Sequence, residues 1–220
     1  MDKLKGILFA ALSAATFGLI PLYANQAILD GVNNETILVY RYGIAGVLYA
    51  IYLLFRGTNM RLSRGELQEV TIAGVGGYGI TAFFLMWSYH YMPTGVATAI
   101  HFFYPVVVAL LMAIFYKERL PLAVRAGIVL AICGVYLLSW TPGEVKWMGL
   151  FFVLMSTLTY GCYITALNRP VLKRINPDVL TCYVLLFTAL FYLIVAVARG
   201  KMEIITRPRF LMDMGQLAVL

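Results

Sequence analysis

The sequence predicts an all-α integral membrane protein, a helical bundle of seven transmembrane helices plus the start of an eighth, built from an inverted 5+5 repeat. Three observations predict this class. Apolar residues make up 62% of the 220 residues and charged residues only 12%, seven long stretches carry almost no charge, and the chain resembles itself at an offset of 143 residues. Too few ionised groups are present to cover a water-soluble domain, so lipid must be the solvent for most of the chain.

Each uncharged stretch is long enough to cross a bilayer as a helix. A helix rises about 1.5 Å per residue, so about 20 residues span a hydrocarbon core of about 30 Å while satisfying every backbone polar group internally. The first stretch runs uncharged to Leu29, which is too long for the apolar core of a cleaved signal peptide. The predicted spans cover residues 4–25, 37–55, 70–89, 96–116, 122–140, 147–167 and 179–198.

Short polar segments rich in helix breakers separate these spans, so neighbouring helices are expected to be antiparallel. Positive loops are retained in the cytoplasm, and a cytoplasmic N-terminus places eleven of the 17 Lys and Arg residues inside and six outside. The cluster of Arg199, Lys201, Arg207 and Arg209 opposes this orientation. The predicted connecting segments are residues 30–35, 56–69, 92–95, 117–121, 141–146 and 168–178.

The self-similarity indicates a duplicated unit. Residues 6–57 align without a gap with residues 149–200, and thirteen positions are identical. One period holds five spans, an odd number, so the second copy enters the membrane upside down. The charges agree, because residues 26–35 carry no Lys or Arg whereas the aligned residues 169–178 carry three. We therefore expect a first five-helix repeat at residues 1–143 and a second at 144–220 that ends after two helices and the start of a third, where a complete copy would bring the chain to about 286 residues.

Several motifs resemble the EamA-type members of the drug/metabolite transporter superfamily. They are Gly18, Arg41-Tyr42, the stretch Tyr91-Met92-Pro93-Thr94-Gly95-Val96-Ala97-Thr98-Ala99-Ile100, then Tyr104-Pro105, Lys117-Glu118-Arg119-Leu120, Gly127 and Gly134. The resemblance implies ten helices in two inverted five-helix repeats. It also implies export or exchange of a small metabolite, often an amino acid, through a cavity between the repeats, by alternating access. The early end of the chain departs from this pattern, so a non-transporting membrane fragment or scaffold stays open as the alternative.

Ionisable groups at membrane depth are costly, so each is a functional candidate. All ten carboxylates fall in loops or at helix ends, which argues against a membrane-embedded acidic carrier of protons or sodium and leaves uniport or histidine-linked coupling. His101 is the one titratable side chain near the middle of a span, and histidine titrates near neutral pH. It either lines a cavity or is a neutral histidine in helix packing.

Prolines and aromatic residues supply the other cavity candidates. Pro105 removes a helix hydrogen bond about one turn after His101, which indicates either a cavity-lining interruption or a simple kink, and Pro21 does the same in the first span. Phe17 and Tyr160 occupy equivalent repeat positions. The predicted substrate-binding residues are Phe17, Pro21, Tyr78, His101, Tyr104 and Tyr160.

Two charged residues at helix ends are candidates for a gate or an outer polar contact. Arg41 either reaches a substrate carboxylate or extends to lipid headgroups, and Glu118 either gates or caps the fourth span.

Other classes of function fit the sequence poorly. The basic residues are scattered in small clusters, so lipid and not nucleic acid is the expected partner, beside a small-molecule substrate and a homodimer partner. No metal or cofactor is predicted, because the three cysteines lack metal-ligand spacing. No catalytic residue is predicted either, because no nucleophile has a base or an acidic cluster beside it. A membrane enzyme is therefore the weaker hypothesis. The predicted location is the cytoplasmic (inner) membrane, crossed several times.

Overall fold

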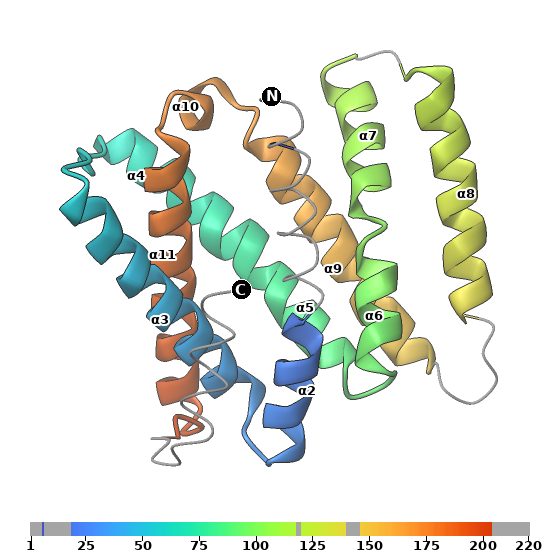
Figure 1. Cartoon of the computed structure of the whole chain (residues 1–220), viewed down its shortest axis with the longest axis horizontal. Helices are drawn as coiled ribbons and strands as arrows, with labels where there is room; N and C mark the ends of the chain where they lie inside the picture. The colour runs from blue at the N-terminus through green and yellow to red at the C-terminus, as the bar shows by residue number, and fades with distance from the viewer. Residues whose placement is uncertain (1–5, 7–18, 118–119, 140–145, 204–220) are drawn as a thin grey trace.

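The computed structural model describes residue 6 and residues 19–117, 120–139 and 146–203. Within these ranges the regular structure is helical throughout, which confirms the predicted all-α class (Figure 1). The elements are α2 (Ile20–Leu29), α3 (Asn34–Phe55), α4 (Arg64–Thr71), the π-helix η1 (Ile72–Gly79), α5 (Ile80–Ser88), α6 (Thr94–His101), α7 (Tyr104–Phe115), α8 (Leu122–Ser139), α9 (Trp147–Ala166), α10 (Pro170–Lys173) and α11 (Pro177–Ala198).

Five helical segments of the described part are long and apolar enough to cross a membrane. They match five of the predicted spans, namely Asn34–Phe55, Arg64–Ser88, Thr94–Phe115, Trp147–Ala166 and Pro177–Ala198. Helix α8 matches a sixth, although its described apolar segment, Leu122–Leu137, is shorter. Most of the predicted first span, 4–25, and the start of the eighth lie outside the described residues.

The third span begins earlier than the sequence suggested. We expected residues 56–69 to form a loop, but α4 starts at Arg64 because Ser63 and Glu66 form a capping box. The Ser63 amide donates to Glu66 Oε2 at 2.7 Å, and the Glu66 amide donates to Ser63 Oγ at 3.3 Å. These reciprocal bonds satisfy free amides of the first turn and allow a polar, exposed turn to be helical.

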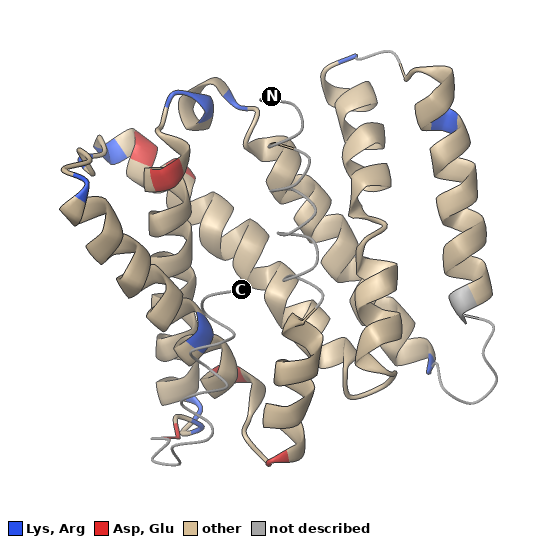
Figure 2. Ribbon diagram, viewed as in Figure 1, with Lys and Arg blue, Asp and Glu red and all other residues tan. Residues whose placement is uncertain are grey.

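Loops gather at two opposite ends of the bundle, and most charged residues lie there (Figure 2). At one end Asn34 contacts His90, and Asn33 bonds to the carbonyl of Lys201. At the other end Arg169 pairs with Glu69 at 2.7 Å. The predicted loops 30–35 and 168–178 therefore lie at opposite ends of the described structure.

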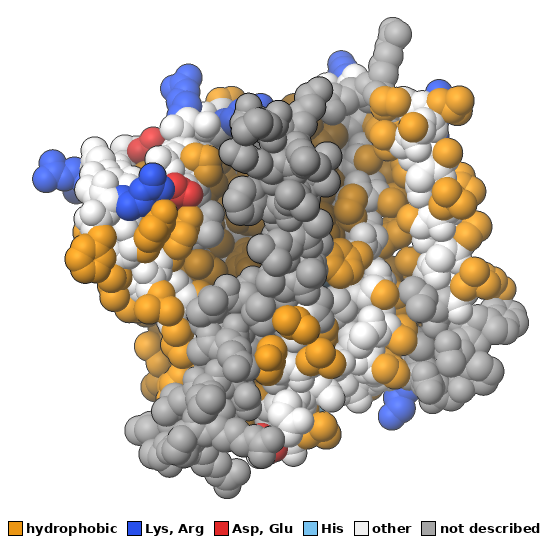
Figure 3. Space-filling view, viewed as in Figure 1, with side chains coloured by type: hydrophobic (Ala, Val, Ile, Leu, Met, Phe, Trp, Pro, Cys, Tyr) orange, Lys and Arg blue, Asp and Glu red, His pale blue; other side chains and the backbone are white. Residues whose placement is uncertain are grey.

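Between these ends the surface is apolar. Large hydrophobic side chains cover the outer faces of α3, α7 and α8 (Figure 3), and among them Leu130 is 73% exposed and Phe115 71% exposed. In water such a surface would aggregate, whereas lipid tails solvate it. The apolar surface and the lengths of the helices together indicate a multi-pass membrane protein.

Helices α3 and α11 form an antiparallel pair at one edge of the bundle (Figure 1), since the start of each lies beside the second half of the other. They pack closely because Gly46 lacks a side chain: a Cβ there would lie 2.8 Å from Leu186 Cδ2. Both helices have 22 residues, begin after an asparagine whose side chain caps the first turn, and end before an Arg-Gly pair. The two glycines have similar positive φ angles, 64° at Gly57 and 60° at Gly200.

Candidate functional site

The third span changes its winding beside the centre of the bundle. Residues Ile72–Gly79 form a π-helix that contains four glycines. Hydroxyl groups bond its carbonyls from outside the segment: Thr188 Oγ1 donates to the Gly74 oxygen at 3.1 Å, and the Tyr192 hydroxyl donates to the Gly79 oxygen at 2.6 Å. A π-helical segment is costly and occurs frequently at functional sites. Here it carries Tyr78, which lines a central pocket.

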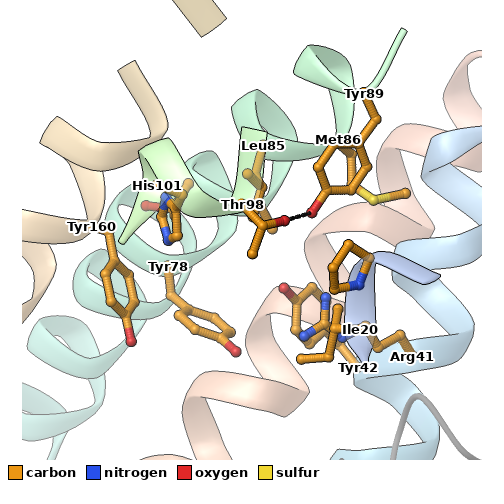
Figure 4. Close-up of a pocket in the computed structure, with 13 residues that line it drawn as sticks. Ile20, Arg41, Tyr42, Tyr78, Leu85, Met86, Tyr89, Thr98, His101 and Tyr160 are labelled. Carbon is orange, nitrogen blue, oxygen red and sulfur yellow. Dashed lines mark hydrogen bonds between the residues drawn. The ribbon is translucent and has the colours of Figure 1, made fainter. Parts of the chain in front are cut away.

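This pocket is the candidate site (Figure 4). Its cavity volume is about 40 Å³. That is enough for a few water molecules but far below the roughly 300 Å³ or more of a typical small-molecule site. The lining residues are Ile20, Pro21, Arg41, Tyr42, Tyr78, Thr81, Ala82, Leu85, Met86, Tyr89, Thr98, His101 and Tyr160.

His101 stands at one side of the pocket, where the fourth span is interrupted. Helix α6 ends at His101 and α7 begins at Tyr104, with Pro105 in its first turn. His101 is 2% exposed, and its Nδ1 lies 3.0 Å from Ser156 Oγ. The Ser156 hydroxyl already donates to the Val153 carbonyl at 2.7 Å, so Nδ1 must carry the proton and donate to Ser156. In neutral His101, Nε2 is then a hydrogen-bond acceptor.

Aromatic rings form the wall between the two sides of the pocket. Tyr160 packs edge to face against Tyr104, with ring centroids 4.6 Å apart. The ring centroids of Tyr160 and His101 are 5.4 Å apart. Tyr78 contacts Tyr42 edge to face at 5.4 Å. Edge-to-face pairs are favourable arrangements of aromatic rings, so these contacts stabilise the positions of the rings.

Arg41 stands on the other side of the pocket, against the ring of Tyr42 (Figure 4). Its Cζ lies 5.2 Å from the centre of that ring. Among the described residues, both ion pairs involve other arginines, Arg169 and Arg199, and Arg41 has no carboxylate partner. An arginine inside a membrane bundle is stable only when paired or solvated, so this pocket favours an anionic group.

The structure brings most of the predicted site residues together. Pro21, Tyr78, His101 and Tyr160 line the pocket, and so does Arg41. Tyr104 does not line it but supports Tyr160 from behind. Phe17 and Glu118 lie outside the described residues.

Sequence reasoning missed several polar lining groups. Tyr89 donates to Thr98 Oγ1 at 3.2 Å, because the Thr98 hydroxyl itself donates to the Thr94 carbonyl at 2.8 Å. Thr81 lines the pocket and bonds to Thr159 at 2.9 Å. Polar residues in otherwise apolar helices were the available signal, since each must find a partner away from water.

Comparison with known proteins identifies the family. The model of the EamA-like transporter family matches residues 4–140, more than half of the chain. The chain belongs to the EamA-like transporter family. This confirms the resemblance seen in the motifs, and it is a family of membrane transporters, not of enzymes.

Two curated relatives of this chain show how far the likeness extends. An "Uncharacterized transporter" of Archaeoglobus fulgidus is 30% identical over 141 residues, which cover 64% of this chain and 49% of the relative. A "Probable terminal-alkyne amino-acid exporter" of Streptantibioticus cattleyicolor is 27% identical over 166 residues, 75% of this chain and 55% of the relative. The chain thus spans about half the length of the curated relatives it matches.

A solved crystal structure shares the fold of this chain. It superimposes with a TM-score of 0.66 over 96% of this chain and 74% of the other, at 18% sequence identity. At that identity the likeness concerns the fold alone.

Proposed function

We propose that this EamA-like chain exports a small metabolite across the cytoplasmic membrane by alternating access, and that the central pocket is the substrate site. One observation carries the proposal. A bundle with an apolar outer surface contains a pocket lined by apolar, aromatic and polar residues, among them an arginine without a carboxylate partner among the described residues. A cation at membrane depth is costly, so a half-buried arginine without a carboxylate partner is a candidate ligand-binding group.

The chemistry of the pocket favours a substrate with an acid at one end and a hydrogen-bond donor at the other. Arg41 offers N–H donors to a carboxylate, and His101 Nε2 offers an acceptor to an amino group. The tyrosine rings between them provide faces for an apolar or cationic group. An amino acid has these features, and the relative from Streptantibioticus cattleyicolor is named as an amino-acid exporter.

An inverted repeat is the second part of the proposal, with seven transmembrane helices and the start of an eighth divided into residues 1–143 and 144–220. The shared bounds of α3 and α11 at an offset of 143 residues support it, as do their antiparallel packing and the opposite positions of loops 30–35 and 168–178. In such a repeat the two copies exchange roles as the pocket opens to one side and then the other. We propose a cytoplasmic N-terminus, as the distribution of basic residues favours.

Flux assays in proteoliposomes would test the function. The Arg41→Gln variant should lose about tenfold to 150-fold in apparent affinity for a transported amino acid, since a hydrogen-bonded charge pair contributes about 1.5–3 kcal/mol. Arg125→Gln, on the exposed face of α8, is the matched control and should leave affinity unchanged. Methyl esters of the same amino acids should compete poorly with wild-type transport. Equal affinity in the two variants would contradict the assigned site.

Coupling through histidine is tested in the same system. Uniport and histidine-linked exchange differ in whether a His101→Gln variant alters the pH dependence of flux. A flux profile that is unchanged between about pH 5 and 8 would exclude His101 from the coupling mechanism. Crosslinking in native membranes would test the predicted homodimer.

The length of the chain favours one second candidate, a membrane fragment that does not transport alone. The chain covers 49% and 55% of the two curated relatives. The full-length Archaeoglobus fulgidus relative, reconstituted beside this chain, provides the comparison. Flux with the longer protein and none with this chain would favour the fragment.

A further inference from the structure

Helices α3 and α11 carry matching charged residues at both of their ends. Glu35 and Arg56 flank α3, and the residues at an offset of 143, Asp178 and Arg199, flank α11. Because the helices are antiparallel, each acidic residue lies at the same end of the pair as the arginine of the other helix. Two equivalent ion pairs are therefore available, Glu35–Arg199 and Asp178–Arg56.

The structure contains only one of these two pairs within its described residues. Arg199 Nη1 lies 2.5 Å from Glu35 Oε1, and the Glu35 side chain is 5% exposed. At the same end Asn33 Nδ2 donates to the Lys201 carbonyl at 2.6 Å and to Glu203 Oε1 at 2.9 Å. These contacts join α3 and α11 at the Glu35 end of the pair.

The opposite end uses other partners. Asp178 Oδ1 accepts a hydrogen bond from the Tyr49 hydroxyl at 2.9 Å. Arg56 turns away from it and donates to the Tyr52 hydroxyl at 3.0 Å. Arg56 and its bond to Tyr52 are exposed, so breaking that bond disturbs no buried contact.

Tyrosines link this arrangement to the pocket. Tyr192 is the counterpart of Tyr49 at the offset of 143, yet its hydroxyl donates to the Gly79 carbonyl of the π-helix and not to Glu35. At the Glu35 end the carboxylate is therefore paired with Arg199. The Tyr192 hydroxyl bonds instead to the π-helix that carries Tyr78. At the other end Asp178 is bonded to Tyr49, and Arg56 has no carboxylate partner among the described residues.

We propose that these four charged residues form a reciprocal switch in which Glu35–Arg199 and Asp178–Arg56 close opposite ends of the pocket in alternation. This inference rests on the proposed transport function. When Glu35–Arg199 separates, the Tyr192 hydroxyl turns to Glu35 and releases the Gly79 carbonyl, and Arg56 takes Asp178 in exchange for Tyr49. The charges stay paired or bonded in both states, so neither state leaves a bare carboxylate.

Side-specific labelling of the pocket would test the switch. A reporter cysteine replaces Ala82, a small lining residue, in a chain whose native cysteines Cys133, Cys162 and Cys182 are replaced by serine or alanine. A membrane-impermeant maleimide is added to proteoliposomes from the side of the Glu35 end. The two arginines are changed first, because both are exposed and because glutamine keeps a hydrogen-bond donor for the buried Glu35 carboxylate.

Opposite shifts are expected from the two arginine variants. Arg199→Gln should raise the labelling rate from the Glu35 side about fivefold, and Arg56→Gln should lower it by a similar factor, which is the typical size of a conformational coupling. The double variant should return to within about twofold of the parent. Glu35→Gln should repeat the effect of Arg199→Gln, and Glu69→Gln, in the unrelated Arg169 pair, is the matched control and should change nothing.

The outcomes separate the switch from the transport proposal, because labelling needs no substrate. Equal shifts in one direction, no shift, or a shift in the Glu69 control would overturn the switch even if Arg41-dependent flux is found. Opposite shifts without any flux would leave the switch in place and refute transport by this chain.

Discussion

Removing one hydroxyl from Ser156 should reverse the proton position on His101. In the structure Ser156 Oγ is the acceptor for His101 Nδ1 at 3.0 Å, and both residues are buried. In the Ser156→Ala variant Nδ1–H has no acceptor from this residue, and an unsatisfied buried donor costs about 1–3 kcal/mol. Moving the proton to Nε2 relieves that cost, and Nε2 then ceases to be an acceptor.

The expected loss follows from that exchange. A substrate amino group that donates to Nε2 would meet a donor instead, so affinity should fall about fivefold to 150-fold, which corresponds to 1–3 kcal/mol. Nitrogen NMR of labelled histidine distinguishes protonated Nδ1 from protonated Nε2, and substrate titration of the same sample gives the affinity. The protein has two histidines, and replacing His90 identifies the NMR signals of His90. The remaining histidine signals then belong to His101.

Thr157 provides a close control for this experiment. It is buried, and like Ser156 it donates its hydroxyl to the Val153 carbonyl, at 2.8 Å, but it has no bond to His101. The Thr157→Val variant removes a hydroxyl of the same kind from the same turn and should leave the His101 signals and the affinity unchanged. An unaltered Nδ1 proton in Ser156→Ala would refute the assignment of the acceptor to Nε2.

Three further predictions concern the helices that position the site. Gly77→Ala should destabilise the protein in detergent by about 1–3 kcal/mol, because the added Cβ would lie 2.8 Å from Tyr163 Cβ; Gly76→Ala, which meets nothing within 4 Å, should be neutral or slightly stabilising. Ser63→Ala should cost about 0.5–2 kcal/mol and speed amide exchange in the first turn of α4 without changing substrate affinity. Tyr192→Phe should cost about 1–3 kcal/mol by removing the 2.6 Å bond to the π-helix, and faster amide exchange confined to residues 72–79 would report it.

The spans could be predicted because lipid imposes a simple rule on sequence. A helix that crosses a bilayer needs an apolar run of fixed length, and such runs are visible in α3, α9 and α11 without any tertiary information. The start at Arg64 was missed for the same reason, since hydropathy treats a polar turn as a loop even when a capping box makes it helical. The π-helix was also invisible, because four glycines among apolar residues have the same hydropathy in either winding.

The site was predictable where one residue was chemically unusual. His101 stood out as a titratable side chain inside a span, and Tyr78 and Tyr160 as aromatics beside glycines. Tyr42 and Tyr89 did not stand out, because membership in a pocket depends on which face of a helix points inward, and that is decided by packing. The Glu35–Arg199 pair joins residues 164 positions apart, so only the folded chain shows it as a contact.

The charged ends and the pocket are coupled because the same two helices build both. Helix α3 carries Glu35 in its first turn and Arg41 about two turns later, while α11 carries Tyr192 two turns before Arg199. A 22-residue helix is stiff, so a displacement of its end moves the pocket wall with it. In the proposed switch, separating Glu35 from Arg199 would therefore move Arg41 and the π-helix contact of Tyr192 in the same step.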